Sequence, residues 1–114
     1  MASSPITPIV SGYDLTTSWT VLYTVPAGAS RIGIDAAVFN NYSAGNESFS
    51  MRIAQTSSAD IFDEIITDEE IRTKGNNLAV ASIGQAVRTT GTIQAKASAN
   101  DAISVNITAT IINT

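Results

Sequence analysis

Residues 92–112 read TIQAKASANDAISVNITATII and carry the strongest periodic pattern of the chain. Apolar side chains occupy the odd positions from Ile93 to Ala99 and again from Ile103 to Ile111, and the even positions between them are almost all polar. Successive side chains of a β-strand point to opposite faces. This alternation therefore predicts two strands, each with one buried face.

The relation between these two strands has two solutions. If they pair with each other, both apolar rows must stay on one face, so the numbers of paired residues must add to an even total. A two-residue turn at Asn100 and Asp101 fails this condition, whereas a three-residue loop over 100–102 pairs Ala99 with Ile103 and meets it. In the alternative, the strands belong to opposite sheets and never pair.

The first half of the chain predicts three more strands by the same alternation, over 19–25, 31–39 and 48–54. The rows taken as their apolar faces are Trp19, Val21, Tyr23 and Val25, then Ile32, Ile34, Ala36 and Val38, then Phe49, Met51 and Ile53. Between the first two strands, Pro26 and Gly28 fit positions i+1 and i+3 of a type I turn that starts at Val25.

The segment 57–77 fits two structures. Its isoleucines and Phe62 follow a helical stripe about as well as they follow two short strands. We favour strands because β-branched isoleucine supports a short helix poorly, and a single helical turn around 63–70 is the alternative. The following residues 78–83, LAVASI, predict a short buried strand.

The composition agrees with an all-β fold. The chain has fifteen isoleucines and three leucines, so most of its large aliphatic side chains are branched at Cβ, which favours strands. A length of 114 residues suits one domain. Seven or eight short strands separated by turns predict an antiparallel β-sandwich of jelly-roll type, formed by residues 13–114.

Residues 1–12 are predicted to form an extended N-terminal arm outside the sandwich. They contain two of the three prolines, and proline cannot donate a hydrogen bond inside a sheet. Such an arm can lie across a neighbouring molecule. Its expected partner-binding residues are Pro5, Ile6, Pro8, Ile9 and Val10.

The charges and the hydropathy exclude two classes of partner. Six basic side chains against ten acidic ones give a net charge of −4, so we expect no nucleic-acid partner. The same sign disfavours anionic lipid surfaces, and no apolar run approaches the roughly 20 residues of a membrane-spanning helix. We expect no membrane partner. The first twelve residues lack the features of a secretory signal, so we expect synthesis in a cytoplasm.

The side-chain chemistry disfavours an enzyme. The chain has no histidine and no cysteine, so a reactive serine or threonine would need a lysine or the chain terminus as its base. The glycines match no phosphate-binding motif. We therefore predict no catalytic residues, no cofactor and no metal ion.

One acidic run was weighed as a site: Asp60, Asp63, Glu64, Asp68, Glu69 and Glu70. Two carboxylates across a cleft suffice for glycoside hydrolysis, and carboxylate oxygens also bind divalent cations. Neither a sugar cleft lined by aromatic residues nor the spacing of a calcium loop is evident. We favour a solvated polar loop, or a subunit contact that faces Arg72 and Lys74.

Trp19 is a second candidate, because an exposed tryptophan can serve as a platform for carbohydrate. At the start of an alternating strand, however, tryptophan is more often a core residue. We therefore place Trp19 in the core.

Residues 16–41, TTSWTVLYTVPAGASRIGIDAAVFNN, resemble a recurring opening of small tailed-bacteriophage virion proteins. This opening is a strand of the form T-x-L-Y-T-V-P-A-G followed by an alternating strand that ends in Asn. The resemblance implies a jelly-roll or sandwich domain, usually a homotrimeric cement, decoration or fibre subunit, and transfers no functional residue. The chain differs from longer members of this group because it lacks a receptor-binding extension.

These observations together predict a structural virion protein. The expected role is a capsid decoration or cement subunit that binds copies of itself, as a homotrimer, and the major capsid protein. The alternative is a tail-tip or fibre module that binds host-surface carbohydrate through loop residues such as Tyr42, Asn46 and Glu47.

Overall fold

The computed structural model describes residues 6–29, 31–55 and 63–112, and this part of the chain holds nine β-strands and one turn of 3-10 helix. The elements are β1 (Ile6–Asp14), β2 (Thr20–Thr24), β3 (Arg31–Asn41), β4 (Glu47–Ala54), β5 (Glu64–Ile71), β6 (Asn76–Leu78), η2 (Val80–Ser82), β7 (Ala86–Arg88), β8 (Thr92–Ala97) and β9 (Ile103–Ile112).

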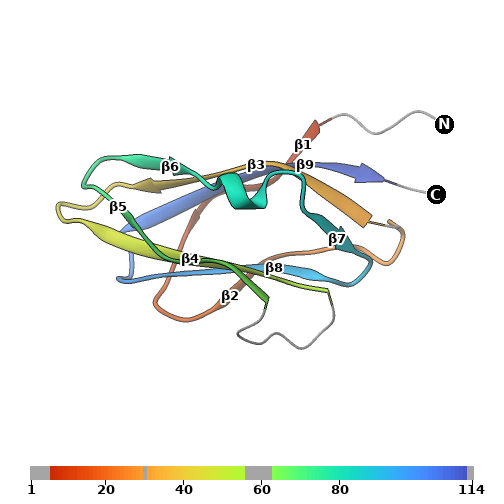
Figure 1. Cartoon of the computed structure of the whole chain (residues 1–114), viewed down its shortest axis with the longest axis horizontal. Helices are drawn as coiled ribbons and strands as arrows, with labels where there is room; N and C mark the ends of the chain where they lie inside the picture. Colours follow the sequence, from red (N-terminus) through yellow and green to blue (C-terminus); the bar gives the residue numbers. More distant parts are fainter. Residues whose placement is uncertain (1–5, 30, 56–62, 113–114) are drawn as a thin grey trace.

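Two antiparallel sheets pack face to face (Figure 1). Sheet A has the strand order β1-β9-β3-β6, with β7 also paired to β3, and sheet B has the order β2-β8-β4-β5. The predicted all-β antiparallel sandwich is therefore confirmed. When β6 and β7 are counted as one interrupted strand, each sheet has four strands, the number expected for a jelly roll of eight strands.

The last two strands lie in opposite sheets, the second of the two solutions that the sequence allowed. β8 pairs with β2 and β4, and β9 pairs with β1 and β3. Both predicted apolar rows still face inward, and Ile93 of β8 and Ile107 of β9 are fully buried. The two rows thus meet across the core instead of lying side by side in one sheet.

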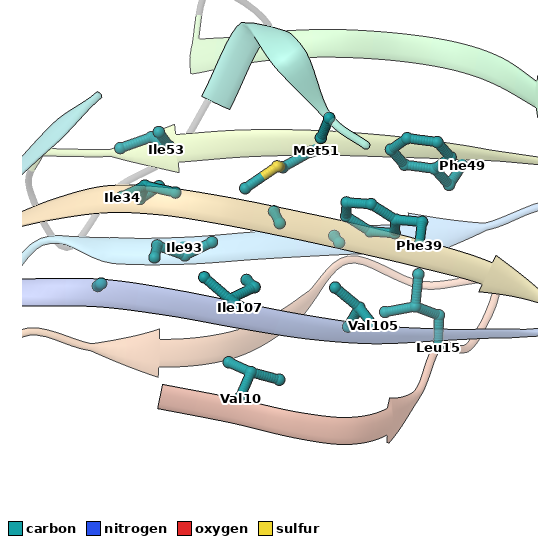
Figure 2. Packing of buried hydrophobic residues seen from close by; sticks show 14 of the residues in the cluster. Val10, Leu15, Ile34, Phe39, Phe49, Met51, Ile53, Ile93, Val105 and Ile107 are labelled. Atoms are coloured by element: carbon teal, nitrogen blue, oxygen red, sulfur yellow. The ribbon is translucent and has the colours of Figure 1, made fainter. Parts of the chain in front are cut away.

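The core lies between the two sheets (Figure 2). Phe39 of β3 and Phe49 of β4 stack across it with ring centroids 3.9 Å apart and an interplanar angle of 15°. Met51, Ile53 and Ile93 extend the apolar layer of sheet B beside them. Packing of branched aliphatic and aromatic side chains from both sheets is what joins the two layers.

A bulge in β3 changes which positions of that strand are buried. Ile34 pairs with Ala109 and Ala36 with Thr108, so Asp35 is an extra residue on the β3 side. Before the bulge even positions face the core, and after it Ala37 and the odd positions do. The expected inward row was therefore wrong beyond Ile34.

A second bulge, between Val21 and Tyr23, changes the face of β2, so the predicted inward row is wrong at Val21 and correct at Tyr23 and Val25. Val21 is 50% exposed, whereas Tyr23 packs against the core. Trp19 is only partly buried and lies on the outer face of sheet B, so its placement in the core was wrong. The turn that follows starts one residue later than predicted, because the Ala29 amide bonds to the carbonyl oxygen of Pro26.

The predicted N-terminal arm was wrong for residues 6–12. These residues belong to β1, which pairs antiparallel with β9 along its length. Pro8 is tolerated because β1 is an edge strand. One side of β1 has no neighbouring strand, so an amide donor is not required there. Residues 1–5, including Pro5, lie outside the described residues.

The middle of the chain is part strand and part turn. β5 confirms a strand over 64–71, and residues 56–62 lie outside the described residues. The buried strand predicted over 78–83 was wrong, because Val80–Ser82 form a 3-10 turn and Val80 is 70% exposed. The Ser82 hydroxyl donates to the carbonyl oxygen of Ala79 and closes this turn.

Candidate binding surfaces

The predicted partner-binding residues are distributed over both sides of β1. Ile6 is 65% exposed and Pro8 is also exposed, so both are accessible to a partner. Ile9 is partly buried against the core, and Val10 is a core residue at 6% exposure (Figure 2). Val10 is therefore unavailable to a partner in the folded chain.

The outer face of sheet B carries a row of four side chains that crosses all its strands. Thr20 pairs with Ala95, which places Trp19 beside Lys96, and Lys96 pairs with Ser50. The Ser50 hydroxyl then contacts β5, since it accepts a hydrogen bond from the Asp68 backbone amide at 2.9 Å. The row therefore runs from Trp19 through Lys96 and Ser50 to Asp68.

Two cations hold Trp19 in this position. The Arg52 guanidinium carbon lies 4.1 Å from the centroid of the Trp19 ring, and Lys96 Nζ lies 5.0 Å from it. Arg52 is itself oriented by Gln94, because Arg52 Nε donates to Gln94 Oε1 at 2.9 Å. Gln94 is only 7% exposed although it points outward. A tryptophan beside two cations is a favourable electrostatic arrangement.

A polar hollow of about 250 Å³ adjoins this row on the outer face of sheet B. Its lining includes four hydroxyl side chains, Thr17, Ser48, Ser50 and Ser98. Lys96 and Asp68 also line it and form no ion pair with each other. The hollow thus presents a cation, an anion and several hydroxyl groups to one small ligand.

The sequence did not identify this site as a unit. Ser50, Arg52, Gln94 and Lys96 occupy the polar positions of alternating strands, which predicts only an outward direction. Their neighbours across the sheet depend on register, and register is not encoded in any one strand.

A groove with both apolar and polar lining lies where the edges of the two sheets meet. It is lined by Ile65 and Ile66 of β5 and by Leu78 and Val80 of the β6–η2 segment, and has a volume of about 400 Å³. Leu78 is 48% exposed and Val80 is 70% exposed. Exposed apolar groups gathered in this way mark surfaces for association.

The acidic run follows the edge strand β5. Residues 67–70 are exposed, and Glu69 lies at this groove. Within residues 6–29, 31–55 and 63–112, no group of three or more acidic residues is arranged to hold a metal ion. Asp60 lies outside the described residues. Arg72 and Lys74 were expected to face the acidic run. Within this chain, the Lys74 ammonium donates to the backbone oxygen of Tyr42 at 2.7 Å.

The loop residues of the alternative carbohydrate site make hydrogen bonds within the chain. Tyr42 donates to Asp14 Oδ1 at 3.1 Å, Asn46 Oδ1 accepts from the Thr73 amide, and Glu47 Oε1 accepts from Ser98 Oγ. Partial desolvation raises the pKa of Tyr42 above its ordinary value of 10.0, and the hydrogen bond and charge of Asp14 raise it further. The phenol therefore remains protonated at neutral pH.

The helical element of the described residues is the 3-10 turn Val80–Ser82. It does not have the length and the apolar content that a membrane crossing requires.

No known family model and no curated protein matches this chain. Among solved structures, its fold is similar to that of a chain in the crystal structure of the T13 IBDV viral particle, with a TM-score of 0.60 and 12% sequence identity. The similarity covers 96% of this chain and 30% of that chain, so this chain spans less than a third of its length. At this identity the similarity shows a shared fold, and membership of the tailed-phage group stays a prediction. A domain with this fold thus occurs in a viral particle.

Proposed function

We propose that this chain is a structural virion protein, a capsid decoration or cement subunit made in the host cytoplasm. It would stabilise a phage head by associating with copies of itself, as a homotrimer, and by binding the major capsid protein. The observation that carries the proposal is the fold similarity to a chain of a viral particle over 96% of the present chain. The phage head and the trimer rest on the resemblance of residues 16–41.

Two surfaces support an associating role. The groove between β5 and η2 exposes the apolar side chains Leu78 and Val80, and the edge strand β1 exposes Ile6. Edge strands and exposed apolar patches are commonly covered by another subunit. We propose that the groove is the contact between copies and that β1 faces the capsid.

No reaction is proposed for this chain. The loop at Tyr42 and Asn46 is not proposed as a carbohydrate site, because its polar groups already bond within the chain. The expected partners are therefore proteins of the virion.

Light scattering after gel filtration tests self-association, and co-sedimentation with capsids of the encoding virus tests attachment. The expected mass is three times the 11.9 kDa of one chain. Val80→Asp should dissociate the trimer by placing a charge in the contact without disturbing the core, since Val80 is 70% exposed. Val21→Asp is the matched control, because Val21 is also exposed but lies on sheet B.

A monomer that does not sediment with capsids at any concentration would contradict the proposed function. A trimer that Val80→Asp leaves intact would contradict only the placement of the contact in the groove.

A further inference from the structure

The row of side chains on the outer face of sheet B has features that association between subunits does not require. The Trp19 ring is partly exposed at the start of the edge strand β2, and two cations lie within 5.0 Å of its centroid. Covering the sheet requires an apolar side chain but no positive charge beside it. Here two positive charges and a partly exposed aromatic ring are accessible to a ligand at the same place.

Neither Arg52 nor Lys96 forms an ion pair within the described residues, although the pairing of β4 with β5 places Glu64 opposite Arg52. Arg52 uses Nε for Gln94. The remaining guanidinium N–H groups of Arg52 suit a planar anion such as a carboxylate, which accepts two parallel hydrogen bonds. The ammonium of Lys96 supplies a second positive charge beside it.

The adjoining hollow has the groups that recognise a polyol. Hydroxyl side chains such as Thr17 and Ser48 can both donate and accept, and the Asp68 carboxylate accepts from ligand hydroxyl groups. Lys96 lines the hollow and also approaches Trp19, so the two features are continuous. At about 250 Å³, the hollow is slightly smaller than common sites for drug-sized ligands, and it suits one sugar ring.

These features select among anionic ligands. Asp68 places a negative charge in the hollow, which disfavours a compact phosphate or sulfate dianion there. The net charge of −4 also disfavours unspecific attraction of polyanions. A ligand that carries its single negative charge at one end and hydroxyl groups at the other satisfies both halves of the surface.

We propose that the outer face of sheet B binds a saccharide that carries a carboxylate group. One sugar ring lies in the hollow, the saccharide extends from it past Lys96 to pack against Trp19, and its carboxylate binds Arg52 and Lys96. Asp68 accepts hydrogen bonds from the sugar hydroxyls. This site is separate from the groove between β5 and η2 and does not depend on the virion role.

Binding is measured on the full chain by calorimetry and by the fluorescence of Trp19, the one tryptophan of the sequence. The probes are oligogalacturonate, oligoalginate and sialyllactose, with maltotriose as the neutral sugar and sodium phosphate as the plain anion. We expect the fluorescence to change with at least one acidic sugar, and binding of maltotriose and of phosphate to be at least tenfold weaker.

The variants separate the site from the general charge of the protein. Trp19→Ala and Lys96→Gln should each weaken binding of the acidic sugar at least tenfold. Arg88→Gln removes the same charge from sheet A and should leave binding unchanged. Trp19→Phe retains an aromatic face and covers the case in which Trp19→Ala does not fold, which melting curves report.

Three results would overturn the proposal: no binding of any acidic sugar at millimolar concentration, equal binding of phosphate, or equal loss of affinity in Arg88→Gln and Lys96→Gln. None of them bears on trimer formation or capsid attachment, so the two proposals fail separately.

Discussion

At the scale of single residues, every buried side-chain nitrogen and oxygen in the described part of the chain has a hydrogen-bond partner. Asn41 is fully buried, and its amide nitrogen donates to the backbone oxygens of Gly45 and Ile71, each at 2.9 Å. Its side-chain oxygen accepts from both the amide and the hydroxyl of Ser43. All four hydrogen-bonding positions of the side chain are therefore used. Asn41 fixes the end of β3 to the loop after it and to the end of β5.

Asn41→Asp should destabilise the fold in a pH-dependent way. The aspartate would lose both donors and place a charge against two carbonyl oxygens, which raises its pKa in the folded state above the unfolded value. The variant therefore loses least stability below the unfolded pKa of about 4 and progressively more as the pH rises, reaching about 3 kcal/mol or more at pH 7. Urea denaturation at pH 4 and pH 7 measures the difference.

Asn40→Asp is the control for this variant, because Asn40 is partly exposed at the neighbouring position. Equal losses at both pH values would show that the Asn41 carbonyl contacts contribute little.

At the scale of elements, the strands on the sheet edges are protected in different ways. β1 carries Pro8 and two register shifts, which interrupt a regular edge. The backbone of β7 forms hydrogen bonds with the side chain of Gln55, which follows β4 of sheet B. Gln55 Oε1 accepts from the Arg88 amide at 2.9 Å, and Gln55 Nε2 donates to the Ala86 oxygen at 2.8 Å. The side-chain amide thus replaces a strand partner for this short element.

Removal of residues 1–12 should destabilise the sandwich itself, contrary to the behaviour of a free arm. The deletion takes Val10 from the core and exposes the edge of β9 to water. Loss of the Val10 side chain alone is worth about 2 kcal/mol. Circular dichroism during heating should show a lower melting temperature or an unfolded chain.

Removal of residues 1–5 is the matched control, since it leaves β1 entire. An unchanged melting temperature after removal of residues 1–12 would show that pairing of β1 with β9 does not contribute to stability.

At the scale of the whole molecule, most strand pairs join distant parts of the sequence. Ile6 pairs with Thr110, so the two ends of the described chain lie in adjacent strands at one end of the sandwich (Figure 1). The consecutive strands β8 and β9 do not form a hairpin, because they belong to opposite sheets. The sandwich therefore forms only when both sheets close around one core.

Folding should consequently be slow and cooperative. All-β domains dominated by pairing between distant segments fold in roughly milliseconds to seconds, and a single domain of this size unfolds in one transition. Stopped-flow refolding followed by Trp19 fluorescence and by far-UV circular dichroism should give the same rate constant. A Trp19 signal that precedes the circular dichroism change would show that sheet B forms before the core closes.

Several features of this protein follow from the sequence alone. The all-β class and the inward rows of β8 and β9 were predictable, because side-chain alternation is a local property of each strand. The strand at 48–54 follows from the same rule, whereas the pattern of 57–77 fitted a helix about as well, and the β-branching of isoleucine favoured strands there. The bulges at Asp35 and Leu22 were not predictable. A bulge moves the following side chains to the other face of the strand, and its position depends on the pairing with the neighbouring strand.

The tertiary structure alone decided which strands share a sheet and which side chains share a surface. The proline-containing β1 became an edge strand because β9 offers it backbone partners from almost the whole chain away. The same holds for the candidate site. Arg52 of β4, Lys96 of β8 and Trp19, which precedes β2, are far apart in sequence, and only the register of these strands brings two cations to one ring. Alternation determines the direction of a side chain, whereas its neighbours depend on contacts between segments that no local pattern contains.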